Sequence, residues 1–167
     1  MSDSMTDDVV ALGRLNSAYA DVITRRAFEE LGELMLPTCV VHLDLVSAPA
    51  RDLTGPEAVA EMLGPAMARF DHFLFAIRHS VVQRGDERDG GGDPDRAVGR
   101  MFISEIRHDL ASDTWEETHG LYEDDYRRVD DRWWFAERHY RSLARNAADS
   151  VVLGLPDRMR HAGRPGR

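Results

Sequence analysis

The chain has 167 residues, a length that suits one domain built around one hydrophobic core. Its formal net charge is -9 at pH 7, and all 21 basic residues are arginine. Because nucleic-acid binding depends on clustered cationic side chains, this acidic balance argues against a nucleic-acid partner. The lack of lysine excludes Schiff-base catalysis and the phosphate-binding lysine of Walker-type loops.

The N-terminal segment and the cysteine content bear on the cellular setting. Residues 1–8 are polar and acidic apart from two methionines, and no long apolar stretch follows them. This pattern predicts a cytoplasmic protein with no membrane partner. Cys39, the single cysteine, cannot form an internal disulfide and is expected to pack as a small apolar side chain.

Two helices and a strand are predicted before residue 50. Thr6 can cap the first helix, in which apolar residues recur at helical spacing as far as Ile23. A short second helix starts near Phe28 and stops before Pro37. The β-branched segment from residue 39 to 46 then predicts a strand.

A third helix and a set of long strands follow. Thr54 and Glu57 have the spacing of a capping box, and Pro65 should kink or divide the helix that they begin. The predicted strands span residues 72–84, 96–108, 114–128 and 132–143. This order predicts an α+β fold with helices on one face of a curved antiparallel sheet.

Two segments outside these elements are glycine-rich or polar. The triple glycine within residues 85–94 predicts a flexible hairpin loop rather than a phosphate-binding loop, because no helix follows it. The domain is expected to span residues 1–145 and to be followed by a tail, 146–167, whose last dozen residues are predicted to be disordered. Whether the apolar residues 151–153 dock onto the domain is left open.

The last two predicted strands form a hairpin with an acidic turn. If residues 130–132 make a three-residue turn, Asp124 lies opposite Arg138 and the two side chains form a cross-strand ion pair. We expect this pair to be structural. Trp133, Trp134 and Phe135 cannot all face one side of the sheet, so some of them should fill the core and the rest a subunit contact, which predicts a homo-oligomer, a dimer or a trimer.

This hairpin, with the pattern Gly-x-Tyr-x-Asp, an acidic turn and then Trp-x-Phe-x-x-Arg, resembles the closing strands of SnoaL-like proteins. These form a branch of the nuclear transport factor 2-like superfamily. The resemblance extends over about residues 7 to 143 and includes the strand segment Ile77-Arg78-His79. It implies a cone in which the curved sheet wraps around the helices and encloses a central pocket for a small hydrophobic molecule.

His79 is the first candidate for chemistry. In a regular strand Phe73, Phe75, Ile77 and His79 share one face, so the imidazole would stand at the end of an apolar wall. One interpretation is a core histidine that a backbone carbonyl satisfies. Resemblance to scytalone dehydratase, a relative of SnoaL-like proteins, implies instead that His79 is a general acid/base.

Other candidates come from the same resemblance. Similarity to ketosteroid isomerase, another superfamily member, implies that Tyr19 donates a hydrogen bond to a developing enolate oxygen. The general base of that family falls on Leu43, so a base at the adjacent Asp44 needs a shift in register of one residue. The second histidine of the dehydratases falls on Arg107, and a bulge could bring His108 into its place.

The sequence thus favours an enzyme of lyase or isomerase type that needs no cofactor. We expect proton transfer (dehydration, isomerisation or cyclisation) on a hydrophobic cyclic or polyketide-like substrate. The expected catalytic residues are His79, Tyr19 and Asp44, and the expected substrate contacts are Tyr122, Phe75, Ile77, His108 and Trp134. The alternative is a non-catalytic ligand-binding or partner-binding module, which the replacement of the dehydratase aspartate by Thr24 favours.

Histidine spacing gives no metal signature. The seven histidines include no His-Glu-x-x-His motif and no pair four residues apart. The sequence therefore predicts no metal site.

Overall fold

A computed structural model of the chain describes residues 2–46, 48–85, 92–146 and 151–152. The helical segments are α1 (Ser2–Arg25), the 3-10 helix η1 (Phe28–Glu33) and α2 (Pro56–Met67). The strands are β1 (Met35–Asp44), β2 (Arg51–Thr54), β3 (Phe70–Arg84), β4 (Arg96–Asp109), β5 (Thr114–Val129), β6 (Arg132–Asn146) and β7 (Val151–Val152). The four long strands lie within three residues of their predicted bounds, whereas β2 was not predicted.

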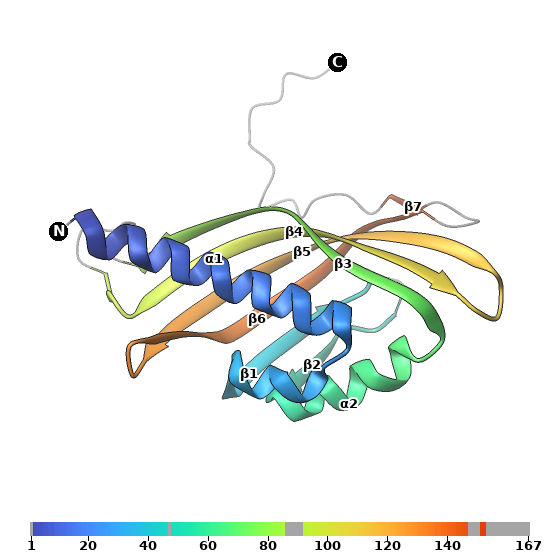
Figure 1. The fold of residues 1–167 in the computed structure, drawn as a ribbon, viewed down its shortest axis with the longest axis horizontal. Coiled ribbons are helices and arrows are strands. Elements are labelled where there is room, and N and C mark those ends of the chain that lie inside the picture. Colours follow the sequence, from blue (N-terminus) through green and yellow to red (C-terminus); the bar gives the residue numbers. More distant parts are fainter. Residues whose placement is uncertain (1, 47, 86–91, 147–150, 153–167) are drawn as a thin grey trace, which may run out of the picture.

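The strands form a single curved sheet in the order β2-β1-β6-β5-β4-β3, with β7 paired to β6. Neighbouring strands are antiparallel except β1 and β6, which are parallel, so the sheet is mixed rather than purely antiparallel. In Figure 1 the long helix α1 lies across one face of the sheet, and α2 lies beside the β1 and β2 end. The predicted α+β cone is confirmed.

Helix α1 supplies the apolar layer that the concave face of the sheet needs. Leu12, Tyr19 and Ile23 lie on one stripe of the helix and are all at least 96% buried. The helix begins at Ser2, before the predicted cap at Thr6. It ends at Arg25, and Arg26 follows with a left-handed backbone (φ 63°).

Helix α2 starts without the predicted capping box. Thr54 is the last residue of β2 and pairs with Val40, so it cannot cap a helix. Gly55 occupies the N-cap position with φ 84°, a conformation open to glycine, and its amide donates to the Cys39 carbonyl at 2.8 Å. The helix also continues through Pro65 instead of dividing there.

The terminal hairpin reaches the predicted pairing by a different route. Asp130 and Asp131 form a two-residue turn in which both residues have positive φ, 51° and 59°, so the three-residue turn was wrong. A bulge in β6 then adds Ala136 as an extra residue. This bulge, rather than the turn, places Asp124 opposite Arg138.

The ends of the chain are described in part. Val151 and Val152 pair with Arg145 and Ala144, so these two residues dock onto the sheet. The predicted disorder of the last dozen residues and most of the predicted glycine-rich loop lie outside the described residues. Within the described residues, no helix is both long and apolar enough to cross a membrane.

Candidate active site

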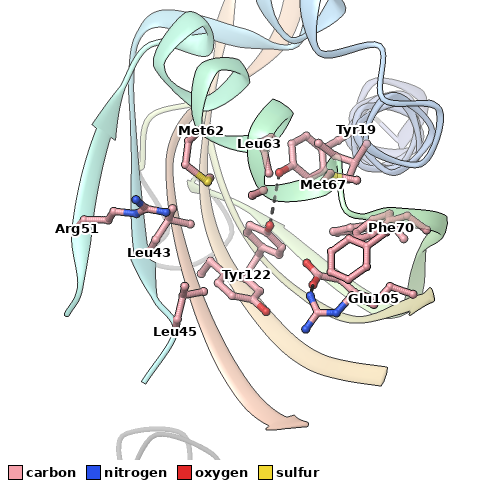
Figure 2. Close-up of a pocket in the computed structure, with 16 residues that line it drawn as sticks. Tyr19, Leu43, Leu45, Arg51, Met62, Leu63, Met67, Phe70, Glu105 and Tyr122 are labelled. Carbon is pink, nitrogen blue, oxygen red and sulfur yellow. Dashed lines mark hydrogen bonds and ion pairs between the residues drawn. The ribbon is translucent and has the colours of Figure 1, made fainter. Parts of the chain in front are cut away.

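A pocket of about 190 Å³ lies between α2, the end of α1 and the concave face of the sheet. Figure 2 shows Met62, Leu63 and Met67 of α2 along one side and Tyr122 on the sheet opposite them. The remaining lining residues are Tyr19, Ile23, Leu43, Leu45, Arg51, Ala66, Phe70, Phe73, Phe75, Glu105, Arg107 and Tyr140. Most of these are apolar or aromatic, which is typical of a small-molecule site with a few fixed polar groups.

Glu105 places a carboxylate in this apolar setting. On β4 the inward side chains Met101 and Ile103 are followed, at the same spacing of two, by Glu105 and Arg107. The Glu105 side chain is 18% exposed, and its Oε2 lies 3.3 Å from Nη1 of Arg107. Burial raises the pKa of Glu105, and the positive charge of Arg107 opposes that rise. Arg107 also donates to Glu116 at 2.9 Å, so it has a second anionic partner.

Three tyrosines supply hydroxyl groups to the same pocket. Tyr19 and Tyr122 lie with their hydroxyl oxygens 3.4 Å apart, as Figure 2 shows. Burial raises the pKa of Tyr19, Tyr122 and Tyr140, so all three stay neutral hydrogen-bond donors near neutral pH. Gly120 makes room for the Tyr140 ring, because a Cβ there would lie 2.4 Å from its Cε2. The glycine of the hairpin motif therefore has a packing function next to the pocket.

An ion pair beneath the tyrosines holds this wall in place. Arg138 Nε donates to Asp124 at 2.7 Å, and both side chains are fully buried. The Arg138 guanidinium carbon lies 3.9 Å from the ring centre of Tyr19 and 4.2 Å from that of Tyr122. The Tyr126 hydroxyl donates to Asn16 at 2.9 Å and also lies 3.3 Å from the Asp124 carboxylate. The predicted ion pair is confirmed, and it supports the pocket from behind.

The structure places His79 outside the pocket, which corrects the prediction of an imidazole on the pocket wall. A bulge makes Arg78 an extra residue between Ile77 and His79, so the side chains after it change faces. His79 is exposed and stacks on Phe102, with ring centres 4.4 Å apart. The apolar wall that it was expected to end is formed by Phe73 and Phe75 alone, since Ile77 is half-buried and does not line the pocket.

Asp44 and His108 also lie away from the pocket. Asp44 forms an ion pair with Arg141, while its neighbour Leu43 faces the pocket, as the alternation of a regular strand requires. In the described residues, β4 pairs with β5 without a bulge near His108. Arg107 therefore faces the pocket and His108 does not. His108 binds Asp71 and Asp113. Both expected positions are therefore corrected.

The aromatic residues Trp133, Trp134 and Phe135 are divided between the two faces of β6. Trp133 and Phe135 are buried in the core, whereas Trp134 is half-buried under the guanidinium of Arg132 and does not line the pocket. Trp134 as a substrate contact is corrected by this placement. The oligomer prediction rested on exposed Trp133 or Trp134 and stays a prediction.

Sequence reasoning found Tyr19, Tyr122 and Phe75 in the pocket and missed Glu105 and Tyr140. The signal for Glu105 was present: two charged residues continue an alternating inward row on β4. For Tyr140 there was no such signal, because its face depends on the bulge at Ala136.

A match to the family model of the SnoaL-like domain covers residues 4–139. The chain belongs to this family. A search of curated proteins found no match.

Solved structures share the fold at low sequence identity. A candidate scytalone dehydratase from Novosphingobium aromaticivorans DSM 12444 is 19% identical with a TM-score of 0.76, covering 96% of this chain and 100% of its own. The hexachlorocyclohexane dehydrochlorinase LinA-type3 from Novosphingobium barchaimii LL02 is 13% identical with a TM-score of 0.73, covering 93% and 100%. An uncharacterised protein with a cystatin-like fold from Caulobacter vibrioides is 12% identical with a TM-score of 0.62, covering 80% and 88%.

Proposed function

We propose that the pocket catalyses cofactor-independent proton transfer on a small hydrophobic molecule that is cyclic or polyketide-like. The observation that carries this proposal is the placement of Glu105, the one carboxylic acid among the residues that line the described pocket. A carboxyl group with a raised pKa in an apolar site is suited to take up and return a proton near neutral pH. Glu105 thus takes the function that the sequence suggested for His79.

The neighbouring hydroxyl groups complete the chemistry. Ionised Glu105 removes a proton from a carbon next to a carbonyl, and the electron pair moves to the carbonyl oxygen. The neutral hydroxyl of Tyr122, Tyr140 or Tyr19 donates a hydrogen bond to that oxygen. Return of the proton to another carbon gives isomerisation. In dehydration, protonated Glu105 gives the proton to a β-hydroxyl, which leaves as water while the carbon–carbon double bond forms. The candidate dehydratase and the dehydrochlorinase of the same fold support an elimination chemistry.

The second candidate function is a ligand-binding module without catalysis. The contact between Arg107 and Glu105 favours it, because a guanidinium at 3.3 Å stabilises the ionised carboxylate and makes it a weaker base. In this case the same pocket holds the small molecule and no bond is broken.

Ligand screening and α-proton exchange separate the two functions. A panel of enones, hydroxyketones and cyclic ketones is screened by thermal shift, since a ligand at one hundred times its Kd adds about 2.7 kcal/mol to the free energy of unfolding. Each binder is then followed by NMR in D2O for deuterium incorporation next to the carbonyl. Glu105→Gln should lower the exchange rate about 10²- to 10⁴-fold while keeping ligand affinity within a few-fold.

His79→Gln is the matched control, because His79 lies on the other face of the sheet and should leave the exchange rate unchanged. The rate of the unsubstituted protein should rise with pH through a pKa above the ordinary glutamate value of 4.5, because only ionised Glu105 is a base. Full exchange in Glu105→Gln would contradict the assignment. Binding without any exchange would establish the module.

A further inference from the structure

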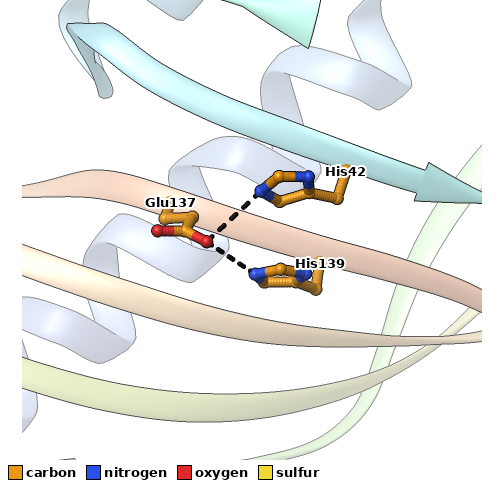
Figure 3. A group of neighbouring side chains, drawn as sticks. All are labelled: His42, Glu137 and His139. Atoms are coloured by element: carbon orange, nitrogen blue, oxygen red, sulfur yellow. Dashed lines mark hydrogen bonds and ion pairs between the residues drawn. The ribbon is translucent and has the colours of Figure 1, made fainter. Parts of the chain in front are cut away.

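A second polar cluster lies on the face of the sheet opposite the pocket. His42 on β1 and His139 on β6 are directly opposite each other across the parallel strand pair, and Glu137 precedes His139 by two residues on the same face. The two imidazole rings are stacked with centres 4.1 Å apart and planes within 16°. Figure 3 shows that both rings turn a nitrogen toward the Glu137 carboxylate.

Three donor atoms converge at this point. Nε2 of His139 lies 2.7 Å and Nε2 of His42 lies 3.2 Å from Oε1 of Glu137. All three ligand atoms lie within 4.8 Å of one another. Donors bound to a tetrahedral Zn²⁺ at about 2.0–2.1 Å are about 3.3 Å apart. The contact between His42 and Glu137 already has this spacing, whereas the shorter contact between His139 and Glu137 would lengthen by about 0.6 Å when an ion binds.

The tautomer of His42 is fixed from the other side. Its Nδ1 lies 2.7 Å from the Asp52 carboxylate on β2, so this nitrogen carries the proton that Asp52 accepts. In neutral His42 the Nε2 atom then has a free lone pair, and this lone pair faces the carboxylate of Glu137. Two acceptors then face each other unless a second proton or a metal cation lies between them. In metal sites a carboxylate commonly accepts a hydrogen bond from the other ring nitrogen of a ligating histidine and so orients it.

We propose that His42, Glu137 and His139 bind a divalent transition-metal ion such as Zn²⁺, with Asp52 orienting His42. Two imidazoles and one carboxylate match the ligand preference of Zn²⁺ and leave one position open for water. The half-exposed side chains, 32% for His42, 45% for Glu137 and 48% for His139, leave the site open to an ion from solution. This proposal is independent of the function of the pocket and replaces the expectation of no metal site.

Such an ion would link strands β1 and β6, which are distant in the sequence. His42 and His139 are far apart in sequence, and β1 and β6 form the one parallel pair among the described strands. A metal bound to both strands should therefore stabilise this junction of the sheet. The adjacent groove, lined by Asp52, Glu123 and His139, gives a bound ion access to solvent.

His108 provides a matched control on the same protein. It also contacts two carboxylates, but Asp71 binds its Nδ1 and Asp113 its Nε2, so these groups lie at opposite ends of the ring. One metal ion cannot lie between His108 and both carboxylates at the same time. His108→Gln should therefore leave metal binding intact.

The test is Zn²⁺ titration of the full chain, free of any histidine tag and treated with chelator, by isothermal calorimetry. One Zn²⁺ should bind per chain, and the melting temperature should rise with Zn²⁺. His42→Gln and His139→Gln should each weaken binding at least tenfold, and Asp52→Ala about 10- to 100-fold. Co²⁺ should give the visible absorption of a tetrahedral site in the unsubstituted protein and in His108→Gln.

The proposal is overturned if no stoichiometric binding occurs, or if binding survives in both histidine variants. Circular dichroism checks that the variants fold. Should either histidine variant unfold, Glu137→Gln decides, since loss of binding there supports the site and unchanged binding overturns it.

Discussion

Strand β6 carries charged side chains on both of its faces within three consecutive residues. Arg138 points inward, is fully buried and has one carboxylate partner, Asp124, under a layer of aromatic rings. Glu137 and His139 point outward, are about half exposed and meet a third group from a different strand. Three neighbouring residues thus contribute both to a buried ion pair that supports the pocket wall and to an exposed candidate metal site.

The difference between the faces is one of solvation. A buried charge costs several kcal/mol to desolvate, so it is tolerated only with a partner in place and contributes to the fold as a unit. An exposed charge keeps most of its hydration, contributes little to stability and can exchange its partner for an ion. We therefore expect substitutions of Arg138 to act on folding and substitutions of Glu137 to act on binding.

The largest expected effect is that of Arg138→Met. This variant leaves the Asp124 carboxylate buried without its partner and should lower the free energy of unfolding by about 3–5 kcal/mol. Urea denaturation followed by circular dichroism measures the change. The double variant Asp124→Leu with Arg138→Met is the control and should recover most of the loss, because it removes both charges. If Arg138→Met is as stable as the original protein, the ion pair does not stabilise the fold.

A much smaller effect is expected for Glu137→Gln in the absence of metal. Its side chain is 45% exposed, so the change in the free energy of unfolding should stay within about 1 kcal/mol. The same denaturation experiment, repeated with and without Zn²⁺, sharpens the comparison. Zn²⁺ should stabilise the original protein and not the variant. A loss similar to that of Arg138→Met would erase the distinction between the two faces.

The smallest effect is a pH dependence at His108. Its hydrogen bond to Asp71, and then the contact with Asp113, raise the pKa of this imidazole above its ordinary value of 6.5. The folded state therefore holds the proton more tightly, and the resulting stabilisation is full below pH 6.5 and is lost as the pH rises through the raised pKa. His108→Gln should flatten the dependence of the melting temperature on pH in this range. An unchanged pH profile would contradict the assignment.

Much of the fold could be predicted from the sequence. The long strands and the apolar stripe of α1 follow local periodicity, and the glycine, tyrosine and aspartate of the hairpin motif identified the family. Resemblance to relatives of the family suggested Tyr19 and Tyr122 as pocket residues, and both line the pocket. These features depend on residues close in sequence.

What only the tertiary structure decided depends on single extra residues in strands and on strand pairing. The bulge at Arg78 moved His79 to the outer face, and the bulge at Ala136 turned Arg138 inward and His139 outward. Each insertion reverses the faces of the residues that follow it in the strand, up to the next bulge, because side chains alternate with a period of two. The parallel pairing of β1 with β6, which brings His42 to His139, is likewise a long-range choice. Composition and periodicity set which residues could be buried, whereas packing of the whole sheet determined which face each of them took.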